Sequence, residues 1–290
     1  MEHIDYLSPD EYSKNCLGKL NEIPQIPEKI WFMGKLPPPT HKLLSVVGSR
    51  DYTTYGKQAV QDLIAGLKNY PVGIVSGLAR GIDGLSHESA LQHDLYTLAI
   101  PGSGLDAKCI YPSRHRGLAQ KIIAHNGGLI SELSPTTKAS KWTFPARNRL
   151  MAGLSDAILL IEATEKSGTL ITARLAVEYN RELLAVPGSI FSPQSVGCNQ
   201  FIKLGATPIT TSQDILEILH IEKKLTQTHA EELNLNDKQK LILATIKPQA
   251  NFETIISKTK LKVDEVQVIL MELEISGHIS QENGLYYNRI

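Results

Sequence analysis

The sequence has few cysteines, no excess of charge of either sign and no long hydrophobic run. Cys16, Cys109 and Cys198 lie far apart and in no metal-ligand spacing, which excludes a disulfide scaffold and a zinc ribbon and indicates a reducing compartment. Thirty Lys and Arg balance thirty Asp and Glu, which excludes a histone-like polycation but leaves room for a local basic groove. Because the start does not resemble a signal peptide and no 18 apolar residues run together, we expect a cytoplasmic protein without a membrane span.

The length and composition are typical of a folded protein of about two domains. The chain has 290 residues, of which 42% are hydrophobic and 21% are charged. Basic residues outnumber acidic ones in the central region 37–220 (17 against 14), but not in residues 1–36 (4 against 6) or 221–290 (9 against 10). Any anion-binding site is therefore expected in the central region.

Residues 37–220 are predicted to form an α/β domain with an extended Rossmann-like parallel sheet. Val60, Leu63, Ile64 and Leu67 have the i, i+3, i+4, i+7 spacing of one helix face. Short, nearly all-apolar strands that alternate with such helices indicate a parallel sheet covered on both faces. The expected strands are residues 43–47, 72–75, 96–100, 129–131, 157–161 and 183–186.

The two ends of the chain differ from this central block. Residues 1–36 are predicted to be a short N-terminal extension, because the prolines at 37–39 interrupt regular structure. The polar stretch 221–234 is predicted to be a linker. In residues 235–290, three helical stretches precede a hairpin with Asn283-Gly284 at its turn, which is the order of a small winged-helix-like domain.

The third helix of this last domain carries apolar residues on one face: Val263, Val266, Leu270 and Leu273. It also carries four acidic residues: Asp264, Glu265, Glu272 and Glu274. Because acidic side chains repel phosphate, a protein contact or a vestigial role is favoured over the reading of DNA.

Loops rich in glycine and hydroxyl groups follow three of the predicted strands. The carboxyl ends of parallel strands share one sheet edge, where ligands bind in such folds. Small residues allow close approach, hydroxyls and helix-start N–H groups donate to anions, and arginine supplies charge. The loops therefore predict a phosphate cradle that consists of Gly48, Ser49 and Arg50 after the first strand, Ser76, Gly77 and Arg80 after the second, and Ser167, Gly168 and Thr169 after the fifth.

The segment 141–149, ahead of the fifth strand, combines two aromatic and three cationic side chains. Aromatic rings stack on bases and cations hold the backbone, so this composition favours a platform for single-stranded nucleic acid. The alternative is that Trp142 and Phe144 are core residues and that the arginines cap a helix. The candidate contacts in this segment are Lys141, Phe144, Arg147, Asn148 and Arg149.

Other signals point away from an enzyme. A G-x-G-x-x-A pattern follows the third strand instead of the first, and no G-x-x-x-x-G-K-[ST] motif occurs, which argues against NAD binding and against a P-loop ATPase. Asp83 and His87 are spaced i, i+4 and form an acid–base candidate, although a local helix contact is commoner. Glu132 and Glu162 follow strands and are predicted to be mostly structural. No catalytic residue, metal or cofactor is predicted.

A series of motifs between residues 41 and 220 occurs in one order. They are Gly48–Arg50, Ser76–Asp83 with His87, Tyr111-Pro112, Ser131-Glu132, Phe144–Arg149, Ser167–Ala173, Pro187-Gly188 and Gly205-Ala206. This set resembles the DNA-processing protein A family (DprA, also called Smf). The resemblance implies a homodimeric protein that binds single-stranded DNA, protects incoming DNA and loads the RecA recombinase onto it during natural transformation. Candidates for the dimer face are Phe201, Ile202, Leu204 and Ile209.

The same resemblance implies roles for individual residues. Arg50 would hold a phosphate, Lys141 and Arg147 would hold neighbouring phosphates, and Phe144 would stack or pack against a base. Either of two further arginines could instead pair with a carboxylate inside the fold: Arg80 and Arg149.

Two other function classes stay open. The fold also resembles the phosphoribohydrolases of the so-called lysine decarboxylase family, whose signature is P-G-G-x-G-T-x-x-E. Here Ser167 replaces a signature glycine and Thr172 replaces the catalytic glutamate, so such a nucleotide-binding hydrolase would lack its acid or base. The third class is a protein adaptor that touches DNA incidentally.

Overall fold

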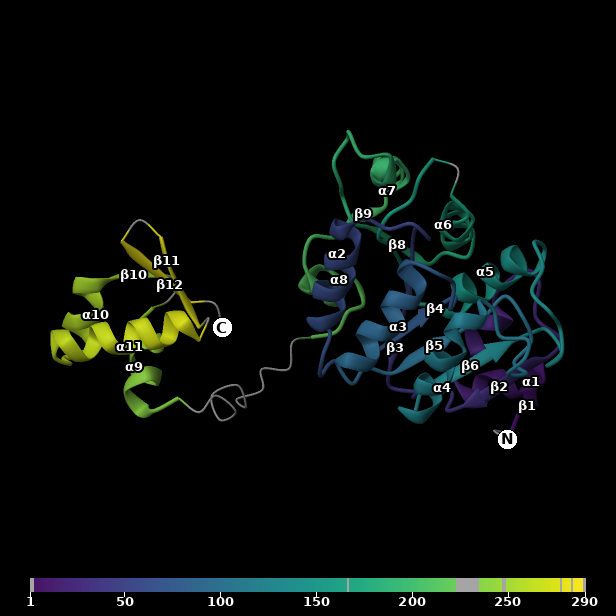
Figure 1. The fold of residues 1–290 in the computed structure, drawn as a ribbon, viewed down its shortest axis with the longest axis horizontal. Coiled ribbons are helices and arrows are strands. Elements are labelled where there is room, and N and C mark those ends of the chain that lie inside the picture. The colour runs from purple at the N-terminus through teal and green to yellow at the C-terminus, as the bar shows by residue number, and fades with distance from the viewer. Residues whose placement is uncertain are drawn as a thin grey trace. The chain divides into compact units, whose positions relative to one another are not determined.

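The computed structural model describes residues 3–165, 167–222, 235–246, 249–276, 278–282 and 284–288. The chain divides into two compact units, Met1–Lys223 and Lys224–Ile290 (Figure 1). Apart from residues 221 and 222, the linker expected over 221–234 lies outside the described residues. In the part of the chain that the structure describes, no helix is both long and apolar enough to cross a bilayer.

A sheet of nine described strands forms the centre of the N-terminal unit, in the order β1-β2-β6-β5-β4-β3-β7-β8-β9. All neighbours from β6 to β9 are parallel, so the predicted α/β class is confirmed. The six strands expected from the sequence occur as β3 to β8. The strands are β1 (Asp5–Leu7), β2 (Ile30–Gly34), β3 (Lys42–Val47), β4 (Val72–Ser76), β5 (Thr97–Ala99), β6 (Gly128–Ser131), β7 (Ala157–Leu160), β8 (Glu182–Ala185) and β9 (Thr207–Pro208).

Helices cover both faces of this sheet (Figure 1). On one face α2, α3 and α8 pack against β3, β4 and β7, and on the other α5, α6 and α7 pack against the same sheet. Val60, Leu63 and Ile64 are buried on α2, as their spacing predicts. The helices are α1 (Pro9–Tyr12), α2 (Thr54–Ala65), α3 (Ile82–Gln92), α4 (Arg116–Ala124), α5 (Thr143–Leu154), α6 (Thr169–Glu178), α7 (Val196–Lys203) and α8 (Ser212–Ile218).

Residues 1–36 supply two strands to the sheet. β2 pairs antiparallel with β6, and β1 pairs antiparallel with β2. Tyr12, Leu17 and Leu20 are fully buried in the core below these strands, and the Tyr12 hydroxyl donates to the Pro27 carbonyl at 2.8 Å. The segment expected to be a short extension is therefore an integral part of the N-terminal unit.

This integration can be tested with Leu20→Ala. The substitution deletes a fully buried side chain, so the free energy of unfolding of the N-terminal unit should fall by about 2–5 kcal/mol. Ile26→Ala removes an exposed side chain of the same segment and should change it by less than about 0.5 kcal/mol. Denaturant unfolding of both variants measures the difference, and equal effects would mean that the segment is not part of the core.

The C-terminal unit has the element order of a winged helix. α9 (Asp237–Thr245), β10 (Gln249–Asn251), α10 (Phe252–Thr259) and α11 (Val263–Ile275) precede the hairpin of β11 (Ile279–Glu282) and β12 (Leu285–Asn288). The strands pair in the order β10-β12-β11. The winged-helix prediction is confirmed, although Val263, expected on the buried face of α11, is half exposed. At the predicted turn Gly284 has φ +78°, and Asn283 lies outside the described residues.

Candidate nucleic-acid interface

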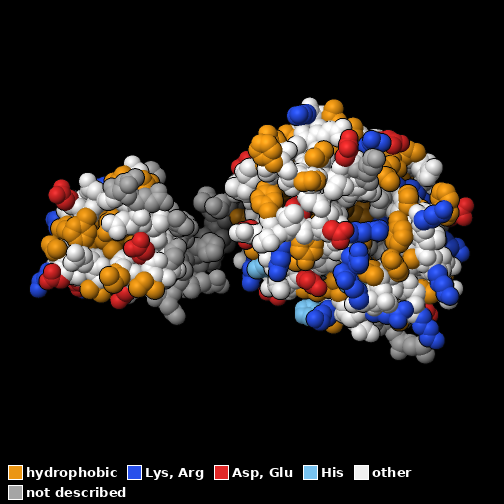
Figure 2. Space-filling model, turned by 45° about the horizontal axis from the view of Figure 1, so that its top comes forward, with side chains coloured by type: hydrophobic (Ala, Val, Ile, Leu, Met, Phe, Trp, Pro, Cys, Tyr) orange, Lys and Arg blue, Asp and Glu red, His pale blue; other side chains and the backbone are white. Residues whose placement is uncertain are grey.

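A cavity of about 770 Å³ lies at the carboxyl edge of the sheet, where loops follow β3, β4 and β7 and where α5 and α6 begin. Its volume is in the range of cavities that bind small molecules or parts of polymers. Lysine and arginine side chains gather on one face of the N-terminal unit (Figure 2). Ten of the residues predicted from the sequence line the cavity: Gly48, Ser49, Arg50, Lys141, Phe144, Arg147, Asn148, Ser167, Gly168 and Thr169.

The loop after β3 is held in place by the loop after β4. The Ile82 amide donates to the Ser49 carbonyl at 3.1 Å. Gly81 has φ +85°, and a Cβ there would collide with the Ser49 carbonyl and lie 2.5 Å from the Arg50 Cα. Only glycine fits this contact without strain, so the second loop fixes the point from which the Arg50 side chain leaves the backbone.

A cation lies over an aromatic ring in the wall of the cavity. The Arg50 guanidinium carbon is 5.5 Å from the centre of the Phe144 ring, which in turn packs against Tyr111 with ring centres 5.7 Å apart. The Thr143 hydroxyl donates to the Gly102 carbonyl at 2.6 Å and fixes the start of α5. A phosphate held by Arg50 would therefore place its attached nucleotide beside an aromatic face.

The start of α6 forms a second anion-binding wall. Ser167 Oγ accepts from the Thr169 amide at 3.2 Å, and the Thr169 hydroxyl donates to the Gly48 carbonyl at 3.2 Å. No heavy atom lies within 4 Å of a Cβ built on Gly168, so the backbone is open to a ligand there. The positive end of the helix dipole favours an anion here.

Arg147 lines the cavity but is buried, and the carboxylate of Asp83 balances its charge. Its side chain is only 7% exposed, Nη1 donates to the Ile100 carbonyl at 2.5 Å, and Nη2 is 4.0 Å from Asp83 Oδ2. Burial lowers the pKa of Arg147 and raises the pKa of Asp83, while their mutual attraction opposes both shifts. The sequence suggested a direct phosphate contact, whereas the structure gives Arg147 a buried carboxylate partner.

Four of the predicted site residues do not line the cavity. The Ser76 hydroxyl is buried and donates to the Val46 carbonyl at 2.7 Å, and Gly77 packs against the Arg147 guanidinium with no space for a Cβ. Arg149 pairs with the carboxylate of Glu132 inside the fold, which was the alternative to a phosphate contact. Arg80 is half exposed, with Nη2 3.9 Å from Asp51 Oδ1.

Comparison with known proteins identifies the family. The model of the family "DNA recombination-mediator protein A" matches residues 4–220, and that of the "DprA winged helix domain" matches residues 226–284. The chain belongs to the DprA family. Protein Smf of Escherichia coli is 37% identical over 251 residues, which cover 84% of this chain and 67% of that protein. DNA processing protein DprA of Streptococcus pneumoniae is 41% identical over 197 residues, covering 68% of each.

Solved DprA structures share this fold. DprA from S. pneumoniae superposes with a TM-score of 0.67 at 36% identity and covers 74% of each chain. DNA processing protein A from Helicobacter pylori, a protein with a single-stranded DNA binding mode, gives 0.65 at 30% identity, covering 76% of this chain and 98% of that one.

The carboxylates of this DprA-family chain that follow strands are structural, as predicted. Glu162 is buried and accepts from the Thr53 amide at 2.9 Å and from the Thr53 hydroxyl at 2.6 Å, which anchors the start of α2. Glu132 is held by Arg149. Thr172, at the position of the hydrolases' glutamate, is buried in the cavity wall. This wall therefore has a threonine where the hydrolases need a carboxylate.

His87 is a core residue that stays neutral near pH 7. It is fully buried on α3, and its Nδ1 lies 2.7 Å from the Thr97 hydroxyl. Burial lowers the pKa of His87 to about 3. A neutral imidazole with so low a pKa is a poor general acid or base at neutral pH, so Asp83 and His87 do not form the acid–base pair that their spacing allowed.

The buried His87 predicts a loss of stability in acid. The unfolded imidazole takes up a proton below about pH 6.5, whereas the folded one resists until about pH 3, so stability falls as the pH decreases through this window. Between pH 7 and pH 5 the free energy of unfolding should fall by about 2 kcal/mol more in the unmodified chain than in His87→Gln. Denaturant titrations at both pH values measure this, and equal losses in the two proteins would contradict it.

The structure corrects one alternative, the burial of Trp142, and adds residues that were not predicted to line the site. Trp142 is 75% exposed, so it is not a core residue, and the Lys141 ammonium is 5.2 Å from the centre of its ring. The other residues that line the cavity include Tyr111, Ser140, Thr164 and Gln194. Tyr111 belongs to the Tyr111-Pro112 motif, but it was not predicted to contact nucleic acid. Ser140, Thr164 and Gln194 are common polar residues, and no sequence pattern distinguishes them from other polar residues of the chain.

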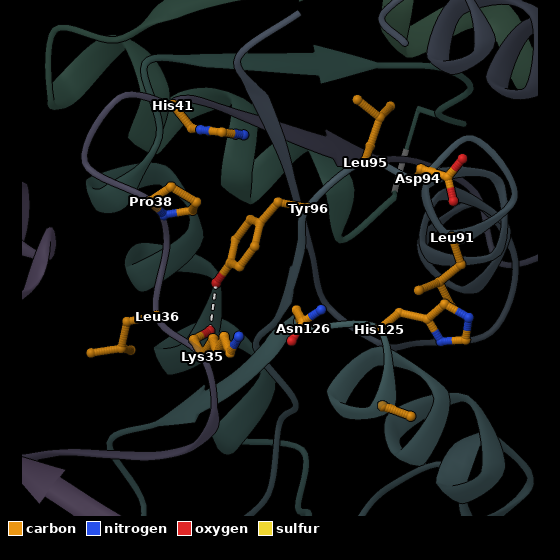
Figure 3. Close-up of a pocket in the computed structure, with 11 residues that line it drawn as sticks. Lys35, Leu36, Pro38, His41, Leu91, Asp94, Leu95, Tyr96, His125 and Asn126 are labelled. Carbon is orange, nitrogen blue, oxygen red and sulfur yellow. Dashed lines mark hydrogen bonds between the residues drawn. The ribbon is translucent and has the colours of Figure 1, made fainter. Parts of the chain in front are cut away.

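A second cavity, of about 600 Å³, lies at the opposite edge of the sheet (Figure 3). Tyr96 and Asn126 line it and come just before β5 and β6, which places it at the amino ends of these strands. The Tyr96 hydroxyl donates to the Lys35 carbonyl at 2.9 Å across its floor (Figure 3). None of the predicted site residues lines this cavity.

Proposed function

We propose that this protein binds single-stranded DNA in the cavity at the carboxyl edge of the sheet. The observation that carries the proposal is the pairing of Arg50 with Phe144 beside the open start of α6. A cation and the positive end of a helix dipole suit two neighbouring phosphates, and an aromatic ring between them suits an unpaired base. The single-stranded DNA binding mode of the H. pylori relative supports the same conclusion.

In this proposal each wall of the cavity contacts a different part of the DNA strand. Arg50 holds one phosphate, and the open backbone at Gly168 holds the next. Phe144 stacks against the base that lies between them. Lys141 and the exposed Trp142 at the rim extend the contact along the strand. Because rings stack on every base, the preference for base type is weak.

Membership in the DprA family supports a proposal about the wider role. We propose that the chain protects incoming DNA and loads RecA during natural transformation, and that it acts as a homodimer. Of the four apolar residues considered for the dimer face, Phe201 and Ile209 are buried in the core. Leu204 is 72% exposed and Ile202 is half buried, so these two are the candidates that a partner subunit could reach.

Arg50→Ala tests the DNA site directly. Removing a charged contact to phosphate should weaken the binding of a single-stranded oligonucleotide about tenfold or more. The slope of log K against log salt should become shallower by about 0.7, the share of one phosphate contact in single-stranded DNA. Fluorescence anisotropy across a salt series measures both quantities.

Arg174→Ala is the matched control, because this exposed arginine of α6 lines a different cavity, beside β8. It should leave both affinity and salt slope nearly unchanged, and neither variant should change thermal stability. An Arg50→Ala protein that melts much earlier would show that Arg50 has a structural role, and the assignment to phosphate would then be wrong.

We also propose that the protein is not an enzyme. The cavity has anion-binding groups, but Thr172 takes the place of the glutamate that the hydrolases use. Contacts that bind a long polymer equally in its ground state and its transition state raise the affinity without accelerating a reaction. Incubation with nucleoside monophosphates, ATP or oligonucleotides should release no free base, ADP or shortened strand above background, as followed by chromatography. Release that disappears in Asp83→Asn or Glu132→Gln would instead favour the hydrolase.

A further inference from the structure

Helix α11 of the C-terminal unit is apolar on two opposite faces. Val266, Ile269, Leu270 and Leu273 are buried and form the core of this unit. On the outer side lie three large apolar residues that solvent reaches: Val268 (58% exposed), Met271 (65%) and Ile275 (82%).

The three exposed residues form a continuous stripe. Their spacing of three and four residues stacks them on one line of an α-helix, about opposite the buried set. A surface helix of a globular unit normally turns a polar face outward, and an all-round apolar helix is normally covered on both sides. Clustered exposed apolar side chains with a polar rim mark interaction sites. The stripe therefore has the character of a surface that a partner covers.

Acidic residues border the stripe. Val263–Ile275 contains Asp264, Glu265, Glu272 and Glu274 and no Lys or Arg. Lys238 of α9 pairs with Glu265, and the Gln239 side chain donates to Glu272 at 2.9 Å. These contacts hold two of the carboxylates on one flank. Figure 2 shows hydrophobic and acidic side chains next to each other on this unit.

We propose that this stripe of Val268, Met271 and Ile275 binds a partner protein through an amphipathic segment with apolar anchors and flanking Lys or Arg. Apolar anchors would cover the stripe, and basic side chains would meet the acidic border. A second copy of the chain fits less well, because symmetric pairing of two such faces brings acidic borders together. DNA fits less well for the same reason of charge.

Three other lysines of this unit lie away from the stripe. Lys258, Lys260 and Lys262 are exposed at the turn from α10 into α11, before the N-terminal end of the helix. The stripe begins beyond the first turn of α11 and runs to Ile275 at its C-terminal end. A nucleic acid held by these lysines would therefore not need Met271 or Ile275. Substitution of these two residues thus distinguishes the binding of a protein segment from the binding of DNA.

The test uses the full chain and a fluorescein-labelled helical peptide with leucines on one face and lysines on both flanks. The peptide should bind with an affinity that falls with salt, and Met271→Ser/Ile275→Ser should weaken it at least tenfold. A peptide with glutamates in place of the lysines should not bind. Val263→Ser, an exposed apolar position of the same helix away from the stripe, should leave binding unchanged.

Thermal unfolding of the double variant should match that of the unmodified chain, since both side chains are mostly exposed. Peptide binding that is absent, or equal in the double variant and the Val263→Ser control, overturns the proposal. Sedimentation that shows a dimer dissociated by the double variant overturns it in favour of a second copy. Loss of duplex DNA binding in the double variant overturns it in favour of nucleic acid.

Discussion

The guanidinium of Arg147 joins parts of the chain that are far apart in sequence. It donates to Ile100 at the end of β5, lies beside Asp83 at the start of α3, and packs against Gly77 after β4. Arg147 itself belongs to α5, the helix that carries Phe144. A buried charge of this kind is tolerated only when it is paired, and removal of one partner from a buried pair costs about 3–5 kcal/mol. The ion pair of Arg147 with Asp83 thus fixes the position of α5 against the carboxyl edge of the sheet.

The fixed position of α5 determines where the groups that would contact DNA lie. With α5 fixed, the Phe144 ring sits opposite Arg50, and the contact of Gly81 with the Ser49–Arg50 backbone fixes the other side. The hydroxyl of Thr169 joins the start of α6 to Gly48 at the end of β3. The cation, the ring and the open helix start are therefore held by groups that do not themselves need to touch the ligand. Such preorganisation lowers the entropy lost when a flexible strand binds.

The sequence predicts the parts of this arrangement that follow from local pattern. The six strands β3 to β8 are short apolar runs between amphipathic helices, and the loops after them contain glycine and hydroxyl residues. β1 and β2 were not predicted, because their strand character depends on the pairing of β2 with β6 and of β1 with β2, and not on a periodic pattern. The burial of Arg147 was not predictable either, since the segment around it shows the same aromatic and cationic composition whether the arginine faces solvent or a carboxylate. Val263 was placed on the wrong face of α11 because the helix is apolar on both sides.

The central claim is that unpaired bases reach the ring of Phe144 while their phosphates are held at the edge of the sheet. The most direct measurement compares an oligothymidine single strand with the same strand annealed to its complement, by anisotropy titration across a salt series. The account predicts tighter binding of the single strand at every salt concentration and a fall in affinity as salt increases. Equal or tighter binding of the duplex would contradict it and would identify the winged-helix unit as the part that binds DNA.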